Sequence, residues 1–166
     1  MMRRIALIPF FLLLAACGLH PLYGSGSSGP VSGLLRSVEV APIGGHEGWL
    51  VRTKLLDRLD QTGNAPAQYR LDVTLDDNIT SYGLRADRAA TQERRTLRAR
   101  YQLVDLSNGS VVLDETAGSD ASIDVVSSEY ATVAAEQTAL ENLSGILADQ
   151  IVSRLAIYAA RTTHHP

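Results

Sequence analysis

The chain has very little cysteine, since Cys17 is the single cysteine among its 166 residues. No disulfide can form within one copy of the chain, so the fold must be stabilised by its apolar core alone. A second long apolar run is also missing. After Leu14 the apolar residues are regularly interrupted by charged or amide side chains, which excludes a further membrane-spanning helix of about 20 residues.

Catalytic motifs are absent as well. The sequence contains no G-x-S-x-G, P-loop, H-E-x-x-H or G-x-G-x-x-G pattern. Its four histidines are scattered, and a metal site needs convergent ligands. The neighbouring carboxylates fall at a strand end or on a helix surface, where solvated acids explain them better than acid–base catalysis does. We therefore predict no enzyme, no metal site and no bound cofactor. The side chains considered are His20, His46, His164, His165, Asp76 with Asp77, and Asp57 with Asp60.

The chain carries no excess of positive charge. It has 15 Lys and Arg against 18 Asp and Glu. Arg3 and Arg4 lie in the N-terminal segment that we expect to be removed, which leaves 13 basic side chains and a net charge of −5. This balance argues against a general nucleic-acid or anionic-surface binder.

The N-terminus has the pattern of a bacterial lipoprotein signal peptide. Arg3 and Arg4 precede an apolar run from residue 5 to 14, which is too short to span a bilayer. The run ends in Leu-Ala-Ala-Cys-Gly, which matches the lipobox that lipoprotein signal peptidase reads. We predict cleavage before Cys17, N-acyl diacylglycerol on that residue, and a stable anchor, because several acyl chains together bind a membrane durably. Gly18 favours the outer membrane over the inner one.

The remaining sequence predicts a tether and one domain. We assign residues 1–16 to the signal peptide, 17–33 to the lipidated cysteine and a Gly/Ser-rich flexible tether, 34–160 to a single domain, and 161–166 to a frayed end. Apolar residues alternate with polar ones in the expected strands and recur every three or four residues in the expected helices. The strands are 35–41, 68–80, 96–106 and 111–116, extended by 120–126; the helices are 47–60 and 128–159.

This order predicts an α+β fold. Strands and helices that each have one apolar face can bury these faces against each other in two layers. We expect a mainly antiparallel sheet of about four strands with two helices packed on one face. The other sheet face, with Arg70, Arg98 and Arg100, must then meet water or a polar partner.

Arginine is concentrated in residues 84–100. This segment holds six arginines against Asp87 and Glu93, a local net charge of +4. The planar guanidinium grips phosphate or carboxylate with two hydrogen bonds, so the cluster predicts an anion site on the expected connection 82–95 and the strand beside it. An equally good interpretation is a solvated loop and strand face paired with acids elsewhere. The arginines are Arg85, Arg88, Arg94, Arg95, Arg98 and Arg100.

Two segments resemble a known family. Residues 17–24, CGLHPLYG, resemble the opening of alphaproteobacterial LptE, the lipopolysaccharide-assembly lipoprotein, and residues 130–137, YATVAAEQ, are similar to the start of its long helix. The resemblance covers essentially the whole mature chain. It implies a non-enzymatic subunit that plugs the lumen of LptD, an outer-membrane β-barrel, assists its assembly, and takes part in lipopolysaccharide insertion.

The resemblance also implies binding residues. The family has a functional basic residue between its second and third strands, where this chain has Arg85 and Arg88. A second basic residue near the start of the last helix has no counterpart, because residues 127–130 are Ser, Ser, Glu and Tyr. Arg94 and Arg95 are the candidates to replace it. The expected ligand is therefore lipopolysaccharide, held by Arg85, Arg88, Arg94 and Arg95.

The sequence leaves three other interpretations open. An auxiliary lipoprotein of an ABC-type lipid transporter would also be a lipidated α+β domain, but would co-purify with inner-membrane or substrate-binding components. A cell-wall hydrolase is disfavoured because no nucleophile–base or metal signature is present. A spacer domain without a ligand would tolerate neutralisation of the arginine cluster.

Overall fold

A computed structural model describes residues 29–59, 66–84 and 90–163. The elements in chain order are α2 (Pro30–Arg36), β1 (Val38–Val40), α3 (Gly45–Leu59), β2 (Tyr69–Leu84), β3 (Ala90–Asp105), β4 (Val111–Asp124) and α4 (Glu129–Thr163). Cys17, Arg85 and Arg88 lie outside the described residues.

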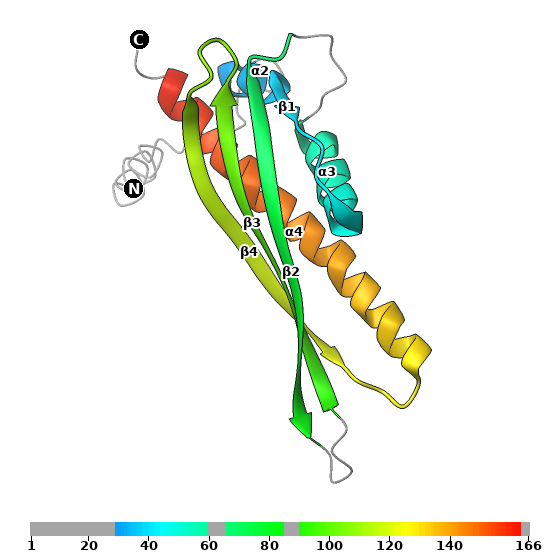
Figure 1. Cartoon of the computed structure of the whole chain (residues 1–166). Helices are drawn as coiled ribbons and strands as arrows, with labels where there is room; N and C mark the ends of the chain where they lie inside the picture. The colour runs from blue at the N-terminus through cyan, green and yellow to red at the C-terminus, as the bar shows by residue number, and fades with distance from the viewer. Residues whose placement is uncertain (1–28, 60–65, 85–89, 164–166) are drawn as a thin grey trace, which may run out of the picture.

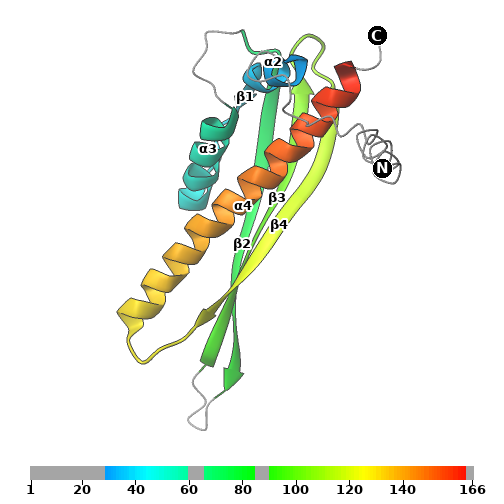
Figure 2. The same ribbon diagram turned by 180° about the vertical axis from the view of Figure 1, so that it is seen from behind.

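The four strands form one sheet in the order β1-β2-β3-β4. β1 pairs with β2 in parallel, and the other neighbours are antiparallel. Helices α3 and α4 cover one face of the sheet, and the opposite face is left open (Figures 1 and 2). The predicted α+β fold, with its mainly antiparallel four-stranded sheet and helices on one face, is confirmed.

The core lies between the sheet and these two helices. Strand residues Leu71, Leu97 and Tyr101 are fully buried, and they alternate with exposed neighbours because successive side chains point to opposite faces. The stripe of α4 that meets them includes Leu147 and Ile151, also fully buried. Each such aliphatic side chain contributes about 1.5–3 kcal/mol to stability, which explains how the sheet holds together without a disulfide.

The first element differs from the prediction. Residues 30–36 are helix α2, where the sequence indicated the end of the tether and the start of a strand. Pro30 occupies the first turn, where its missing N–H costs nothing and its fixed φ angle suits a helix. The Ser37 hydroxyl donates to the Leu34 carbonyl at 2.7 Å, and Leu35 is buried, so α2 packs against α4. The expected strand is thereby reduced to the three residues of β1.

Strands β2 and β3 are longer than predicted. Residues 82–95, expected to be a connection, largely continue the ladder, with pairs such as Tyr82 with Gln92 and Leu84 with Ala90. The alternation of polar and apolar residues is lost at this end of the hairpin, so the sequence showed no strand there. The return strand, predicted as 111–116 extended by 120–126, is one continuous element, β4, which also includes residues 117–119 and ends at Asp124. Helix α4 begins one residue later than expected, and the Ser128 hydroxyl accepts from the Ala131 amide at 3.4 Å.

Candidate functional site

The end of the β2–β3 hairpin, residues 77–84 and 90–95, is called the arm. It extends beyond α3 toward the residues that join the two strands (Figure 1). Arg94 and Arg95 both belong to β3 in the arm, not to a connection. Because they are consecutive strand residues, they point to opposite faces of the sheet. The two arginines therefore have different environments.

Arg94 is on the open face. Its side chain is 55% exposed, and its Nε lies 3.7 Å from the Asp120 carboxylate of β4. The guanidinium also lies over the Tyr82 ring, 5.6 Å from the centroid. The Tyr82 hydroxyl in turn bonds the Ser122 hydroxyl at 3.2 Å. A long, exposed ion pair is worth little, so Arg94 can exchange Asp120 for an incoming anion at small cost.

Arg95 is on the helix-covered face, with its side chain only 12% exposed. Its Nε and Nη2 donate to the two carboxylate oxygens of Asp77 at 2.9 and 2.5 Å, and its Nη1 donates to the Glu136 carbonyl of α4 at 3.0 Å. The hydrogen bonds to Asp77 raise the pKa of Arg95 above its usual value. All three guanidinium nitrogens are thus satisfied within the chain. Through these hydrogen bonds, Arg95 links the arm to the first half of α4.

A second carboxylate, Glu93, lies on the same face. It accepts from the Ser81 hydroxyl at 3.1 Å, while its other oxygen is buried without a partner in the described part of the chain. Burial, followed by the charge of Glu93, raises the pKa of the nearby Glu136. The contact between arm and α4 therefore combines one strong ion pair with two carboxyls that destabilise each other.

On the open face, the arginines that looked like one cationic patch alternate with acids of neighbouring strands. Arg100 donates to both oxygens of Asp114 at 3.0 and 2.7 Å, and these bonds lower the pKa of Asp114 to about 2. Arg70 of β2 is held by Asp72 of the same strand, at 2.9 and 2.8 Å. Among the described arginines of residues 84–100, Arg94, Arg95 and Arg100 each meet an acid that only the strand register brings beside them. Arg85 and Arg88 lie outside the described residues.

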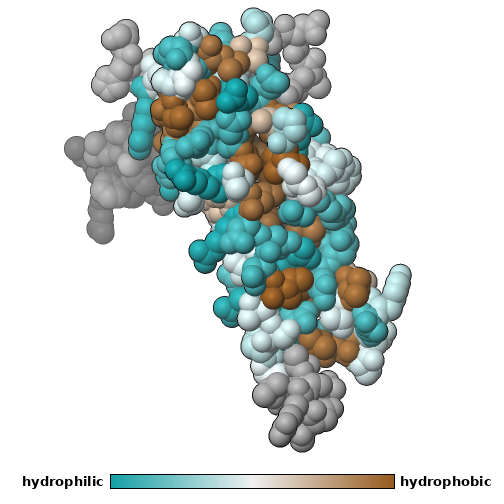
Figure 3. All heavy atoms as spheres, in the orientation of Figure 1, coloured by the Kyte–Doolittle hydropathy of each residue, from teal (hydrophilic) through white to brown (hydrophobic). Residues whose placement is uncertain are grey.

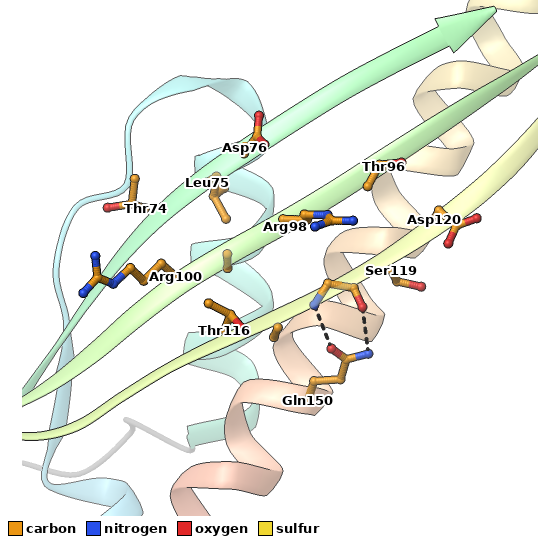
Figure 4. A pocket seen from close by; sticks show the side chains of 13 residues that line it. Thr74, Leu75, Asp76, Thr96, Arg98, Arg100, Thr116, Ser119, Asp120 and Gln150 are labelled. Carbon is orange, nitrogen blue, oxygen red and sulfur yellow. Dashed lines mark hydrogen bonds between the residues drawn. The ribbon is translucent and has the colours of Figure 1, made fainter.

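Arg98 is the exception on this face. It has no ion pair or hydrogen bond with any residue that the structure describes, and it faces Asp76 on one side and Gly118 on the other. A Cβ at Gly118 would lie 3.1 Å from the Arg98 Cγ, so glycine makes room for the guanidinium stem. The surrounding hollow, about 680 Å³, is lined mainly by small and hydroxyl side chains (Figure 4). Its members include Thr74, Thr96, Thr116, Ser119 and Gln150.

Gln150 of α4 closes part of the sheet edge beside this hollow. Its amide accepts from the Gly118 N–H at 3.1 Å and donates to the Gly118 carbonyl at 3.4 Å (Figure 4). These are the bonds that a further strand would make with β4. Sequence reasoning missed Gln150, because nothing in a helix pattern marks one amide as the partner of a distant glycine.

The described ranges contain no group of three or more His, Cys, Asp or Glu arranged to hold a metal ion. Within the same ranges, no helix combines the length and the apolar character needed to cross a membrane. The geometry is that of a binding surface. In the described part of the chain, Arg94 is exposed on the arm and Arg98 lies unpaired on the polar open face. On the helix-covered face, Arg95 is bonded within the chain.

Known proteins resemble this chain in sequence and in shape. A family model described as lipopolysaccharide-assembly matches residues 35–155. A Caulobacter crescentus protein described as a lipoprotein is 27% identical, with a TM-score of 0.64 over 81% of this chain and 98% of that one. The rare lipoprotein B of Shewanella oneidensis is 12% identical, with a TM-score of 0.60 over 76% and 98% of the two chains. A minor lipoprotein of Acinetobacter baumannii is 15% identical, with a TM-score of 0.52 over 73% and 89%. Among curated proteins, none matches the chain in sequence.

Proposed function

The chain belongs to the LptE family of lipopolysaccharide-assembly proteins, and from that premise we propose that it plugs and helps to assemble the LptD β-barrel in the outer membrane. In this role it takes part in the insertion of lipopolysaccharide into the outer leaflet. It performs no covalent chemistry. We further propose that acyl chains on Cys17 hold it at the periplasmic face of that membrane, with the residues after Cys17 as a tether.

The polar open face of the sheet supports the proposal that the partner is a β-barrel. Lumens of outer-membrane barrels are polar, so a plug needs a surface that is polar yet ordered. The open face offers ion pairs such as Arg70 with Asp72 and Arg100 with Asp114, which hold their side chains in place while leaving them wet. The unpaired Arg98 in its hollow can accept a carboxylate from the barrel wall.

The arm supports the proposal that the ligand is lipopolysaccharide. The observation that carries this part is the position of Arg94, exposed on the open face of the arm near the residues that join β2 and β3. Arg85 and Arg88 belong to that joining segment by sequence. We propose that Arg85, Arg88 and Arg94 bind phosphate or carboxylate groups of the ligand through forked hydrogen bonds. Arg95 supports them by fixing the arm through Asp77.

Charge reversal tests the ligand. We expect the Arg85→Glu/Arg88→Glu variant of the purified full chain to lose lipopolysaccharide binding by about tenfold or more, since each lost charge-assisted bond is worth roughly 1.5–3 kcal/mol. The matched control is Arg154→Glu/Arg161→Glu, which changes the same charge at exposed positions of α4 away from the arm. Binding that is unchanged, or equally weakened in the control, would contradict the proposed site.

Affinity purification tests the partner. The tagged, lipidated chain, solubilised from outer membranes, should bring down a large β-barrel in stoichiometric amount. Components of an ABC-type transporter, or no partner, would refute the barrel proposal. If the acyl anchor is correct, the native chain should incorporate labelled palmitate and a Cys17→Ser variant should not.

A further inference from the structure

The apolar stripe of α4 continues beyond the point where α3 stops covering it. Leu140, Leu143 and Leu147 on this stripe are buried. About two and three turns before Leu140, Val133 is 55% exposed and Tyr130 is 85% exposed. By spacing, Val133 and Tyr130 continue the apolar stripe of α4 that is buried further along the helix. In Figure 1 the first turns of α4 extend past the lower end of α3. In the same orientation, Figure 3 shows the side of the molecule that carries the sheet, where brown aliphatic spheres are scattered among polar ones.

An aromatic side chain of α3 extends the same surface. Trp49, the chain's single tryptophan, is 61% exposed and stacks on His46 with ring centroids 6.2 Å apart. His46 Nε2 lies 3.2 Å from Nε2 of Gln137, which is one helical turn from Val133. The surface formed by Trp49, His46, Val133 and Tyr130 is called the apolar end. Exposed aromatic and aliphatic groups gathered at one place are typical of interaction sites.

The charges around the apolar end are nearly all negative. Glu129 precedes Val133 by one turn of α4, and Glu136 follows it by one turn. Glu141 accepts from Gln137 at 3.4 Å. Glu93 of β3 and Glu47 of α3 complete the set. In the described part of the chain, the opposing cations are Arg95, which Asp77 already neutralises, and Arg52, one turn beyond Trp49.

We infer that the apolar end is a docking surface for a protein segment whose apolar side chains are flanked by Lys or Arg. Apolar contact with Trp49, Tyr130 and Val133 supplies the attraction. The surrounding glutamates, called the acidic rim, favour a basic partner. The same rim repels anionic lipid, so this surface is distinct from the arginine site on the other face of the arm. The inference does not depend on the barrel or on lipopolysaccharide.

Photo-crosslinking tests the occupant in the native envelope. Tyr130 is replaced by benzoylphenylalanine in the full lipidated chain, and the segment crosslinked to it is sequenced by mass spectrometry. The expected adduct is a segment of another protein with apolar residues and more than one Lys or Arg. A second copy of this chain, a lipid, a segment without basic residues, or no adduct would each overturn the inference. The same probe at the exposed Ser153 of α4 controls for proximity alone.

Charge dependence is tested on the same crosslink. Glu129→Lys/Glu141→Lys should reduce the yield by about tenfold, because like charges then face each other. Glu39→Lys/Asp57→Lys makes the same change in net charge at exposed positions on β1 and α3, and should leave the yield unchanged. Equal crosslinking yields in the two double variants would contradict the proposal that the acidic rim favours a basic partner. Because every probe lies outside the arginine cluster, this result is separable from the charge-reversal test of lipopolysaccharide binding.

Discussion

Arg95 is the side chain whose removal should most weaken the contact between arm and helix. Arg95→Ala deletes three hydrogen bonds, two to Asp77 and one to the Glu136 carbonyl. It also leaves Asp77, whose side chain is only 17% exposed, as a largely buried carboxylate without its cation. Breaking a well-buried ion pair costs 3–5 kcal/mol and a single charged hydrogen bond about 1.5–3. For this partly buried pair we expect the free energy of unfolding to fall by about 2–4 kcal/mol.

The assay is urea unfolding of the full chain, followed by tryptophan fluorescence and circular dichroism. The midpoint should fall while the dependence on urea concentration stays constant, because the unfolded surface is unchanged. Hydrogen exchange should increase most in the first turns of α4 and in the arm, which the ion pair joins.

Arg100→Ala is the matched control. Arg100 lies on the same strand and forms the same two-pronged bond, but its side chain is 65% exposed. Solvent therefore screens the pair, and its loss should hardly change the midpoint. The reasoning fails if both variants lose equal stability. It also fails if Arg95→Ala costs as much in an Asp77→Asn background as in the native chain, because the double-mutant cycle would then show no coupling.

Three further predictions concern single side chains. Tyr101→Phe should raise the free energy of unfolding by up to about 1 kcal/mol in urea titrations, because the fully buried Tyr101 hydroxyl has no partner in the described chain. Gln150→Ala frees the Gly118 backbone at the β4 edge and should promote self-association, measured by light scattering. Burial and the charge of Glu93 raise the pKa of Glu136 above 4.5 in the folded protein. The protonated carboxyl therefore makes its full contribution to the free energy of unfolding below about pH 4.5, and this contribution is lost as the pH rises through the folded-state pKa. Glu136→Gln should therefore stabilise the protein at neutral pH, by less than about 1 kcal/mol after solvent screening, and flatten its pH dependence.

The fold was predictable where one face of an element is buried and the other is wet. In β2 and β3 the alternation that includes Leu71 and Tyr101 identified both strands and the face that meets the helices. The prediction failed in the arm, where neither face is fully covered and the alternation fades. It failed again at residues 30–36, where the helix starts from Pro30 in a stretch whose composition resembles a linker.

The candidate site was predictable in composition and not in arrangement. The arginine-rich segment is visible in the sequence, and so is its proximity to the expected turn. The opposite orientations of Arg94 and Arg95 follow from strand geometry, but only once both are known to be in a strand. Their partners, Asp120 and Asp77, lie 26 and 18 residues away along the chain, so no local pattern joins them to the arginines.

By itself the sequence determined the fold class, built from strands and helices with one apolar face each, and the family to which the chain belongs. These properties depend on local order and composition. The lipid anchor on Cys17 and the division into a tether and one domain stay predictions. Tertiary structure alone decided which charges are free, which are paired, and which apolar residues stay uncovered. Strand register places Asp114 beside Arg100, and the difference in length between α3 and α4 leaves Val133 and Tyr130 exposed. Charge pairing and burial depend on distances between residues far apart in the chain, and only the folded packing sets those distances.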